Sequence, residues 1–171
     1  MTIQVKRVGK WRSIAGESYR VAEYRPPQFL VDLTEDKATH LPGDMLTTRA
    51  QARYLFGAPM GRAQVSWEAR QSPVSSWSLQ IPGTEGWYLG DSGAWWESDD
   101  EHNADVFASK TDTLDARGER GWTVKLPPTT KGRAARVTIE ATVTDINRQV
   151  VGTRTTSLVH PAEFYVVAKP L

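Results

Sequence analysis

The chain has 171 residues and no cysteine, and its 21 Lys and Arg residues balance 20 Asp and Glu residues to a net charge of +1. This length suffices for one domain with its own core, and the absence of cysteine excludes disulfides, thiol catalysis and thiolate metal sites. The near-neutral charge excludes nucleic-acid binding driven by charge alone. No apolar run has the length of a signal-peptide core or of a bilayer span, so we expect no direct membrane insertion.

Residues 1–18 are a poor beginning for a domain. Short-strand character is indicated by Ile3, Val5 and Trp11, with a break at Gly16. A further strand over residues 19–24 stops at Pro26-Pro27, where two ladder donors are missing and the backbone is extended. We expect residues 1–24 to be the tail strands of a preceding domain with their linker, and residues 25–171 to form the main domain.

The main domain opens with two regions of strict alternation. Residues 29–34 alternate apolar and polar side chains, and a Pro-Gly turn at 41–44 leads to the longest pattern. Its apolar parity carries Leu46, Thr48, Ala50, Ala52, Tyr54, Phe56, Ala63, Val65, Trp67 and Ala69. Because strand side chains change face at every residue, each half is typical of a half-buried strand. With a Gly-Pro turn at 57–61, the pattern predicts an antiparallel hairpin over residues 46–70.

The alternation returns after residue 111. The predicted strands contain Trp122, Val124 and Leu126, then Val137, Ile139, Ala141 and Val143, then residues 150–159 after a tight turn at 145–148, and finally 164–167. About seven strands with turns between them, and no helical period, predict an all-β fold. We expect a seven-stranded antiparallel β-sandwich of the immunoglobulin-like or fibronectin-like type, with Trp67 and Trp122 in its core.

Residues 72–110 break the rhythm and predict a long inter-strand insertion. Ser, Gly and acidic residues dominate it, yet it holds four tryptophans, namely Trp77, Trp87, Trp95 and Trp96. Disordered segments carry few large rings, so we expect a local aromatic cluster. The four tryptophans are the candidate interaction surface of the chain. Three roles stay open for them: the small core of the insertion, a patch that meets a neighbouring domain, or a platform on which sugar rings stack.

Two stretches carry a family resemblance. Residues 19–31, YRVAEYRPPQFLV, resemble the junction between successive macroglobulin domains of bacterial alpha-2-macroglobulins, where a last strand runs into a proline elbow and a Phe-Xaa-Val strand. Residues 50–65, AQARYLFGAPMGRAQV, resemble the hairpin of that family. Thr144-Asp145 and residues 161–166 are similar to its closing strands. The resemblance covers residues 19–71 and 111–171, and does not extend to the insertion.

The resemblance implies a scaffold domain, near the third macroglobulin domain in order (MG3-like), of a large periplasmic or cell-envelope protein that traps proteases. Its partners are then the neighbouring domains of the same protein, and target proteases only through the full-length protein. Members of the family are cleaved in an exposed bait segment, and many attach to the protease through a Cys-Xaa-Glu-Gln thioester. This chain has no cysteine and no bait-like segment, so we expect no trap chemistry, no enzyme activity and no cofactor within it.

Two other motifs invite a functional reading. Residues 90–93, Gly-Asp-Ser-Gly, match the nucleophile motif of chymotrypsin-like proteases, but His40, His102 and His160 lie outside that family's histidine context. We expect a Gly-rich turn there. The acidic run Glu97, Asp99, Asp100, Glu101 and Asp105 lacks the spacing of a calcium-binding EF-hand loop, and a solvated loop is expected. An adhesion or carbohydrate-binding module is the alternative function, and a hydrolase using Ser92 is a third.

Overall fold

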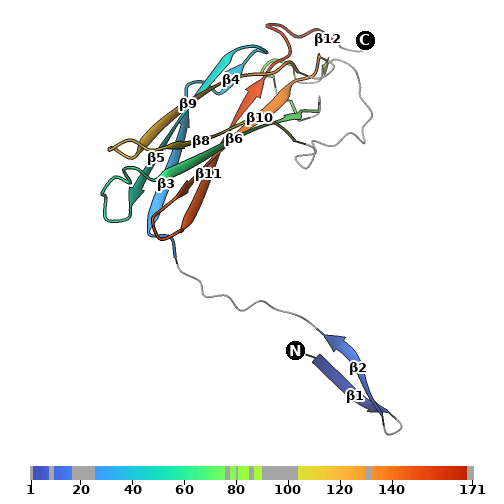
Figure 1. The fold of residues 1–171 in the computed structure, drawn as a ribbon. Helices are drawn as coiled ribbons and strands as arrows, with labels where there is room; N and C mark the ends of the chain where they lie inside the picture. The colour runs from blue at the N-terminus through green and yellow to red at the C-terminus, as the bar shows by residue number, and fades with distance from the viewer. Residues whose placement is uncertain are drawn as a thin grey trace.

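The computed structural model describes residues 2–7, 10–16, 26–75, 78–79, 81–84, 87–89, 104–129 and 132–168. The strands of these residues, all but β7 labelled in Figure 1, are β1 (Thr2–Arg7), β2 (Lys10–Gly16), β3 (Phe29–Glu35), β4 (Thr39–His40), β5 (Met45–Tyr54), β6 (Gln64–Pro73), β7 (Tyr88–Leu89), β8 (Asp105–Thr113), β9 (Glu119–Lys125), β10 (Ala135–Thr144), β11 (Val150–Val159) and β12 (Val167–Ala168).

Two sheets make up the body of the domain. One has five strands in the order β4-β11-β10-β6-β8, and the other has three in the order β3-β5-β9. Six of these eight strands, β3, β5, β6, β9, β10 and β11, correspond to predicted ones, and β8 was not predicted. These seven pair antiparallel with one another. The remaining strand, β4, has two residues and pairs parallel with the end of β11. The all-β sandwich is therefore confirmed, with one more strand than expected.

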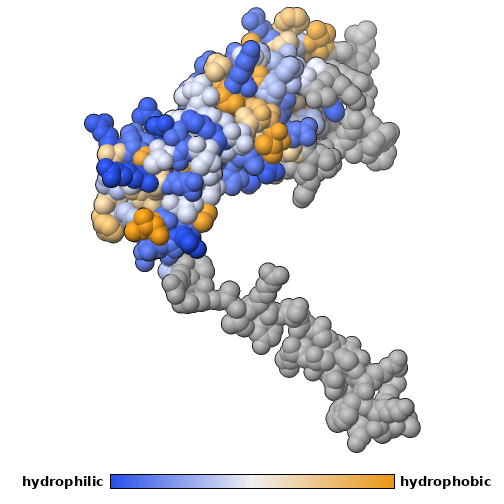
Figure 2. Space-filling model, in the orientation of Figure 1, coloured by the Kyte–Doolittle hydropathy of each residue, from blue (hydrophilic) through white to orange (hydrophobic). Residues whose placement is uncertain are grey.

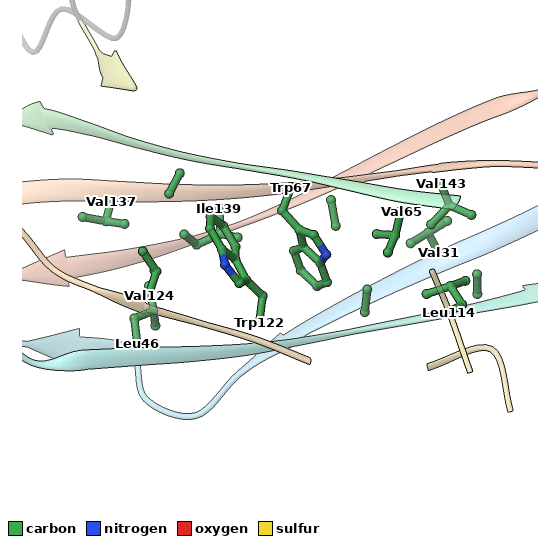
Figure 3. Packing of buried hydrophobic residues seen from close by; sticks show 14 of the residues in the cluster. Val31, Leu46, Val65, Trp67, Leu114, Trp122, Val124, Val137, Ile139 and Val143 are labelled. Carbon is green, nitrogen blue, oxygen red and sulfur yellow. The ribbon is translucent and has the colours of Figure 1, made fainter. Parts of the chain in front are cut away.

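The core lies between the two sheets, as Figure 3 shows. In both sheets, most residues that were predicted to face inward are buried. On the three-stranded sheet Leu46, Ala50 and Ala52 are buried, and on the five-stranded sheet Val65, Trp67 and Ala69 are buried. The later strands follow the same rule with Val137, Ile139, Ala141 and Val143. Trp67 and Trp122 lie in the core, as the alternation predicted, and they project into it from opposite sheets.

The predicted hairpin over residues 46–70 is wrong. Strand β5 belongs to the three-stranded sheet and β6 to the five-stranded sheet, so the two strands face each other across the core. After Tyr54 the chain folds back, with the Met60 N–H donating to the Ala52 carbonyl at 3.0 Å, and then crosses to the other sheet. Period-two alternation states only that each strand has one buried face. It is the same for two strands paired side by side and for two strands packed face to face.

A second crossing lies beside the first. The turn between β8 and β9 also passes from one sheet to the other, and its Leu114 exchanges backbone hydrogen bonds with the β5–β6 crossing. The Arg62 N–H donates to the Leu114 carbonyl at 3.1 Å, and the Leu114 N–H donates to the Ala63 carbonyl at 2.9 Å. These bonds satisfy backbone groups that a strand leaves unpaired when it changes sheets. They hold this end of the sandwich together.

Three sequence boundaries need correction. Residues 72–73 and 105–110 were predicted within the insertion, but residues 72–73 are the end of β6 and pair with β10. Residues 105–110 are the first part of β8, which pairs with β6 starting at Asp105 and Gln71. Phe56 was predicted on the inner face and is exposed, because it follows β5 in a turn. Residues 164–166 form no strand, and only Val167–Ala168 pair, with β7. The β7–β12 pair is a separate sheet from the two main ones.

Strands β1 and β2 pair antiparallel in a two-stranded sheet of their own. The short strand predicted around Ile3 and Val5 is β1, whereas Trp11 lies on the second strand, β2. The strand predicted over residues 19–24 lies outside the described residues.

Candidate interaction surfaces

The described part of the insertion meets the C-terminal segment. Of the four predicted tryptophans, Trp77, Trp95 and Trp96 lie outside the described residues, while Trp87 is 41% exposed. Trp87 follows a turn in which its N–H donates to the Thr84 carbonyl at 3.0 Å. The next two residues form β7, which pairs antiparallel with β12. Trp87 is thereby placed next to a backbone contact between the insertion and the chain's final segment.

The C-terminal segment is attached to the sandwich through His160. Its Nδ1 lies 2.7 Å from the Tyr165 hydroxyl, and the two rings are in edge contact with centroids 5.6 Å apart. Partial burial raises the pKa of the Tyr165 hydroxyl above its ordinary value. The His160 N–H in turn donates to the His40 carbonyl at 2.9 Å. We call this end of the molecule, with the ends of β6 and β11 and residues 160–168, the His160 end.

A cavity of about 270 Å³ lies at the His160 end. It is lined by Thr39, His40, Leu41, Asp44, His160, Ala162, Glu163 and Tyr165. The buried His40 ring donates through Nε2 to the Lys37 carbonyl at 3.0 Å, while its Nδ1 has no partner among the described residues. The volume falls below the roughly 300–1,000 Å³ of typical small-molecule sites. Across the described ranges no group of three His, Cys, Asp or Glu residues is arranged to hold a metal ion.

The other motifs contribute no described site. Ser92 with its Gly-Asp-Ser-Gly turn, His102, and the acidic residues Glu97, Asp99, Asp100 and Glu101 all lie outside the described residues. Asp105 is an exposed first residue of β8, paired through its backbone with Gln71. Of the predicted histidines, His40 and His160 are brought together, although no functional role had been predicted for the pair. Within the part of the chain that the structure describes, no helix has the length and apolarity needed to cross a membrane.

The opposite end carries apolar side chains that sequence reasoning missed. It contains residues 26–28, the β5–β6 crossing and the turns at 114–118 and 145–149, and we call it the Gln28 end. Leu55 is 63% exposed, Phe56 80%, Ile146 91% and Val150 59%. A signal was present in the sequence, because Ile146 occupies a turn position where Gly, Asn, Asp or Ser is the usual choice.

Comparison with known proteins identifies the domain. Residues 29–161 match the family described as Bacterial Alpha-2-macroglobulin MG5 domain. Among curated proteins, an alpha-2-macroglobulin homolog of Nostoc sp. is 47% identical over 60 residues, which are 34% of this chain and 3% of that protein. The alpha-2-macroglobulin of Ralstonia nicotianae is 37% identical over 73 residues, 42% of this chain and 5% of that protein. The chain thus spans only a few per cent of the relatives it matches.

Solved structures show the same fold. The native conformation of Escherichia coli alpha-2-macroglobulin aligns with a TM-score of 0.68 at 18% identity, over 95% of this chain and 10% of that one. The trypsin-activated Escherichia coli protein aligns with a TM-score of 0.63 at 18% identity, over 91% of this chain and 10% of that one. Salmonella alpha-2-macroglobulin reacted with methylamine aligns with a TM-score of 0.67 at 18% identity, over 95% of this chain and 10% of that one.

The family resemblance of the two sequence stretches is therefore confirmed. The domain type is that of the MG5 family, and the expected position near the third macroglobulin domain is corrected. The matched range begins at the first residue of β3 and ends just after β11, which is the whole two-sheet body. The chain belongs to the family of bacterial alpha-2-macroglobulin MG5 domains.

Proposed function

We propose that this chain is a non-catalytic scaffold domain of a bacterial alpha-2-macroglobulin-like protein that traps proteases at the cell envelope. The family match over residues 29–161 carries the proposal. The relatives are far longer than this chain, which supports a role as one module among several. In this proposal residues 1–24 are the tail strands of a preceding domain with their linker, and residues 25–171 are the scaffold module. The partners are the neighbouring domains of the same protein.

The test uses the full-length parent protein. The parent is incubated with trypsin, because one of the structural relatives is described as trypsin-activated. We expect trypsin to lose activity toward a large protein substrate in the presence of the parent, and to keep it in the presence of the 171-residue chain alone. A parent without effect on trypsin contradicts the trap. Inhibition by the isolated chain contradicts the scaffold role.

The two rival functions, carbohydrate binding and hydrolysis, are tested on the same purified protein. A carbohydrate-binding module predicts binding on a glycan array that is lost in Trp87→Ala and Trp95→Ala, since stacked rings supply much of such binding. The exposed side chain of Trp87 is the observation that favours a carbohydrate-binding module as the second candidate. A hydrolase predicts labelling of Ser92 by a fluorophosphonate probe. We expect neither result, because the β7–β12 pair ties the described part of the insertion to the C-terminal segment of the same domain, as expected for a structural element.

A further inference from the structure

The turns of the Gln28 end expose large apolar side chains where polar ones are usual. We define the Gln28-end patch as Leu55, Phe56, Ile146 and Val150, each more than half exposed. In Figure 2 the lower left end of the sandwich, which holds these turns in Figure 1, shows hydrophobic (orange) atoms among polar ones. Apolar side chains gathered at one end of a soluble domain mark an interaction surface more often than scattered single ones.

One residue joins the two halves of the patch. The Gln28 carbonyl accepts a hydrogen bond from the Leu55 N–H at 2.9 Å, and the Gln28 N–H donates to the side chain of Gln149 at 3.4 Å. Leu55 lies in the β5–β6 crossing, and Gln149 precedes Val150 in the β10–β11 turn. Figure 1 shows the start of β3 and the β10–β11 turn side by side. Gln28, close to the start of the domain, therefore lies beside the patch.

The most exposed ring is held in one orientation. Phe56 stacks on Tyr54 with centroids 5.2 Å apart and planes within 5°. The Gly57 N–H donates to the Tyr54 carbonyl at 2.8 Å, which closes the turn under the two rings. The Tyr54 N–H donates to the Ala58 carbonyl at 2.8 Å. A ring fixed in this way loses little conformational freedom when a partner covers it, so its burial favours binding.

We propose that the Gln28-end patch is the docking surface for the module that precedes residue 26 in the parent protein. This rests on the proposed function, because it requires the chain to be one domain of several. Four side chains make a small surface, below the roughly 1,200 Å² of stable interfaces between free partners. A tethered partner is different, since a short linker raises its effective concentration to about millimolar. The preceding module has that tether, and the position of Gln28 directs it to the patch.

Cysteine accessibility tests the docking. The chain has no native cysteine, so Ile146→Cys gives it a single thiol. The rate of maleimide labelling of the peptide containing residue 146 is measured by mass spectrometry in the 171-residue chain and in the uncut full-length parent. We expect labelling to be slower in the parent on the order of tenfold or more, because a covered side chain reacts only after local opening. Arg154→Cys, exposed in the middle of β11, is the control and is expected to react equally in both.

A second substitution tests whether slow labelling of residue 146 is caused by contacts with the patch or by general shielding from the rest of the parent protein. In the parent carrying Ile146→Cys, Phe56→Ser is expected to restore fast labelling, because it removes the central ring of the interface. The matched change Phe164→Ser, an exposed Phe at the His160 end, is expected to leave labelling slow. Each substitution is first made in the 171-residue chain, where an unchanged urea midpoint shows that the sandwich is folded.

Two results overturn the docking. Equal labelling of Ile146→Cys in chain and parent means that no module covers the patch. Labelling of the isolated chain that slows with rising protein concentration assigns the patch to a second copy of the chain. The outcome is independent of the trapping assay, since no protease is present. A parent that protects residue 146 without inhibiting trypsin refutes the proposed trap and leaves the docking, and a parent that inhibits trypsin without protecting residue 146 refutes the docking alone.

Discussion

The indole rings of Trp67 and Trp122 lie 5.8 Å apart between centroids, tilted by 43°, and join the two sheets at the middle of the core. Trp67 comes from β6 of the five-stranded sheet and Trp122 from β9 of the three-stranded sheet. Tilted aromatic pairs add about 0.5–1.5 kcal/mol beyond the area they bury. Because the sheets share no hydrogen-bonded strand, such contacts determine how one sheet sits on the other.

Truncation of Trp67 should be severe, and its replacement by Phe mild. We expect Trp67→Ala to lower the free energy of unfolding by about 3–5 kcal/mol through the cavity it leaves. Trp67 Nε1 is buried and has no hydrogen-bond partner among the described residues. Trp67→Phe keeps a ring in place and removes this unsatisfied donor, so it should cost less than half as much. Urea unfolding of both variants and of Trp122→Ala measures the effect. Equal costs for Trp67→Ala and Trp67→Phe would contradict this packing.

Gly118 should not tolerate a side chain. Its φ is +74°, and a Cβ there would lie 2.4 Å from the Ala52 carbonyl oxygen. Gly118→Ala should therefore cost more than the about 1–2 kcal/mol of a left-handed residue with a side chain. Gly57→Ala is the matched control, since Gly57 has φ +95° and no atom within 4 Å of its Cβ position. The difference between the two unfolding free energies measures the clash, and no difference would contradict the close approach of this turn to β5.

A substitution in the β10–β11 turn should leave the stability of the domain unchanged or raise it. Asp145 organises it by accepting the Gln149 N–H at 2.7 Å, and Arg148 adopts φ +62°, a conformation in which side chains are strained. Arg148→Gly removes that strain, so we expect an unfolding free energy unchanged or raised by up to about 1 kcal/mol. Thermal or urea unfolding of Arg148→Gly measures this free energy. A clear loss of stability would mean that the Arg148 side chain makes a contact that outweighs the backbone strain.

Asp112 should give the domain a pH-dependent component of stability. Hydrogen bonds from Lys110, from the Thr113 N–H and from Arg120 hold the pKa of Asp112 well below its ordinary value. Since the folded-state pKa is depressed, the stabilisation is complete above the unfolded value of about 3.9 and is lost as the pH falls from there towards the folded pKa. Asp112→Asn should thus lower the urea midpoint at pH 7, with a deficit that shrinks below about pH 4.

A control is available for Asp112. Asp32 forms an exposed ion pair with Arg53 at 3.3 Å, and exposed pairs contribute little. Asp32→Asn should change the midpoint at pH 7 less than Asp112→Asn does. A deficit in Asp112→Asn that stays constant between pH 7 and pH 2 would contradict the proposed cause.

The insertion should be removable. Gln71 of β6 pairs with Asp105 of β8, so the strands on either side of it are adjacent. Replacing residues 76–103 by Gly-Asn should leave one cooperative unfolding transition, because the short loop that remains only has to join two strands that already lie side by side. Residues 72–75 are kept, since Ser72 and Val74 are buried. Loss of cooperative unfolding would show that the two-sheet body depends on the insertion.

The sequence predicted the features that depend on residues close together in the chain, and it missed those that depend on residues far apart. The buried parity of Leu46, Ala50, Val65 and Trp67 follows from strand geometry within a few residues, and it is correct. The turn at 145–148 follows from local Asp and Asn chemistry, and it too is correct. The pairing of β5 with β3 and β9 was missed, because the choice of partner is made between residues far apart in the chain.

The sequence alone determined that the protein is an all-β sandwich, which side chains face its core, and which family it resembles, since alternation, turn residues and proline elbows are local properties. Only the tertiary structure decided that β5 and β6 lie in different sheets, and that Leu55 and Gln149 both bond to Gln28. Those relations join residues that are separated by 27 to 121 positions in the chain. They exist only after the strands have packed, which is why the surface at the Gln28 end could not be read from the pattern.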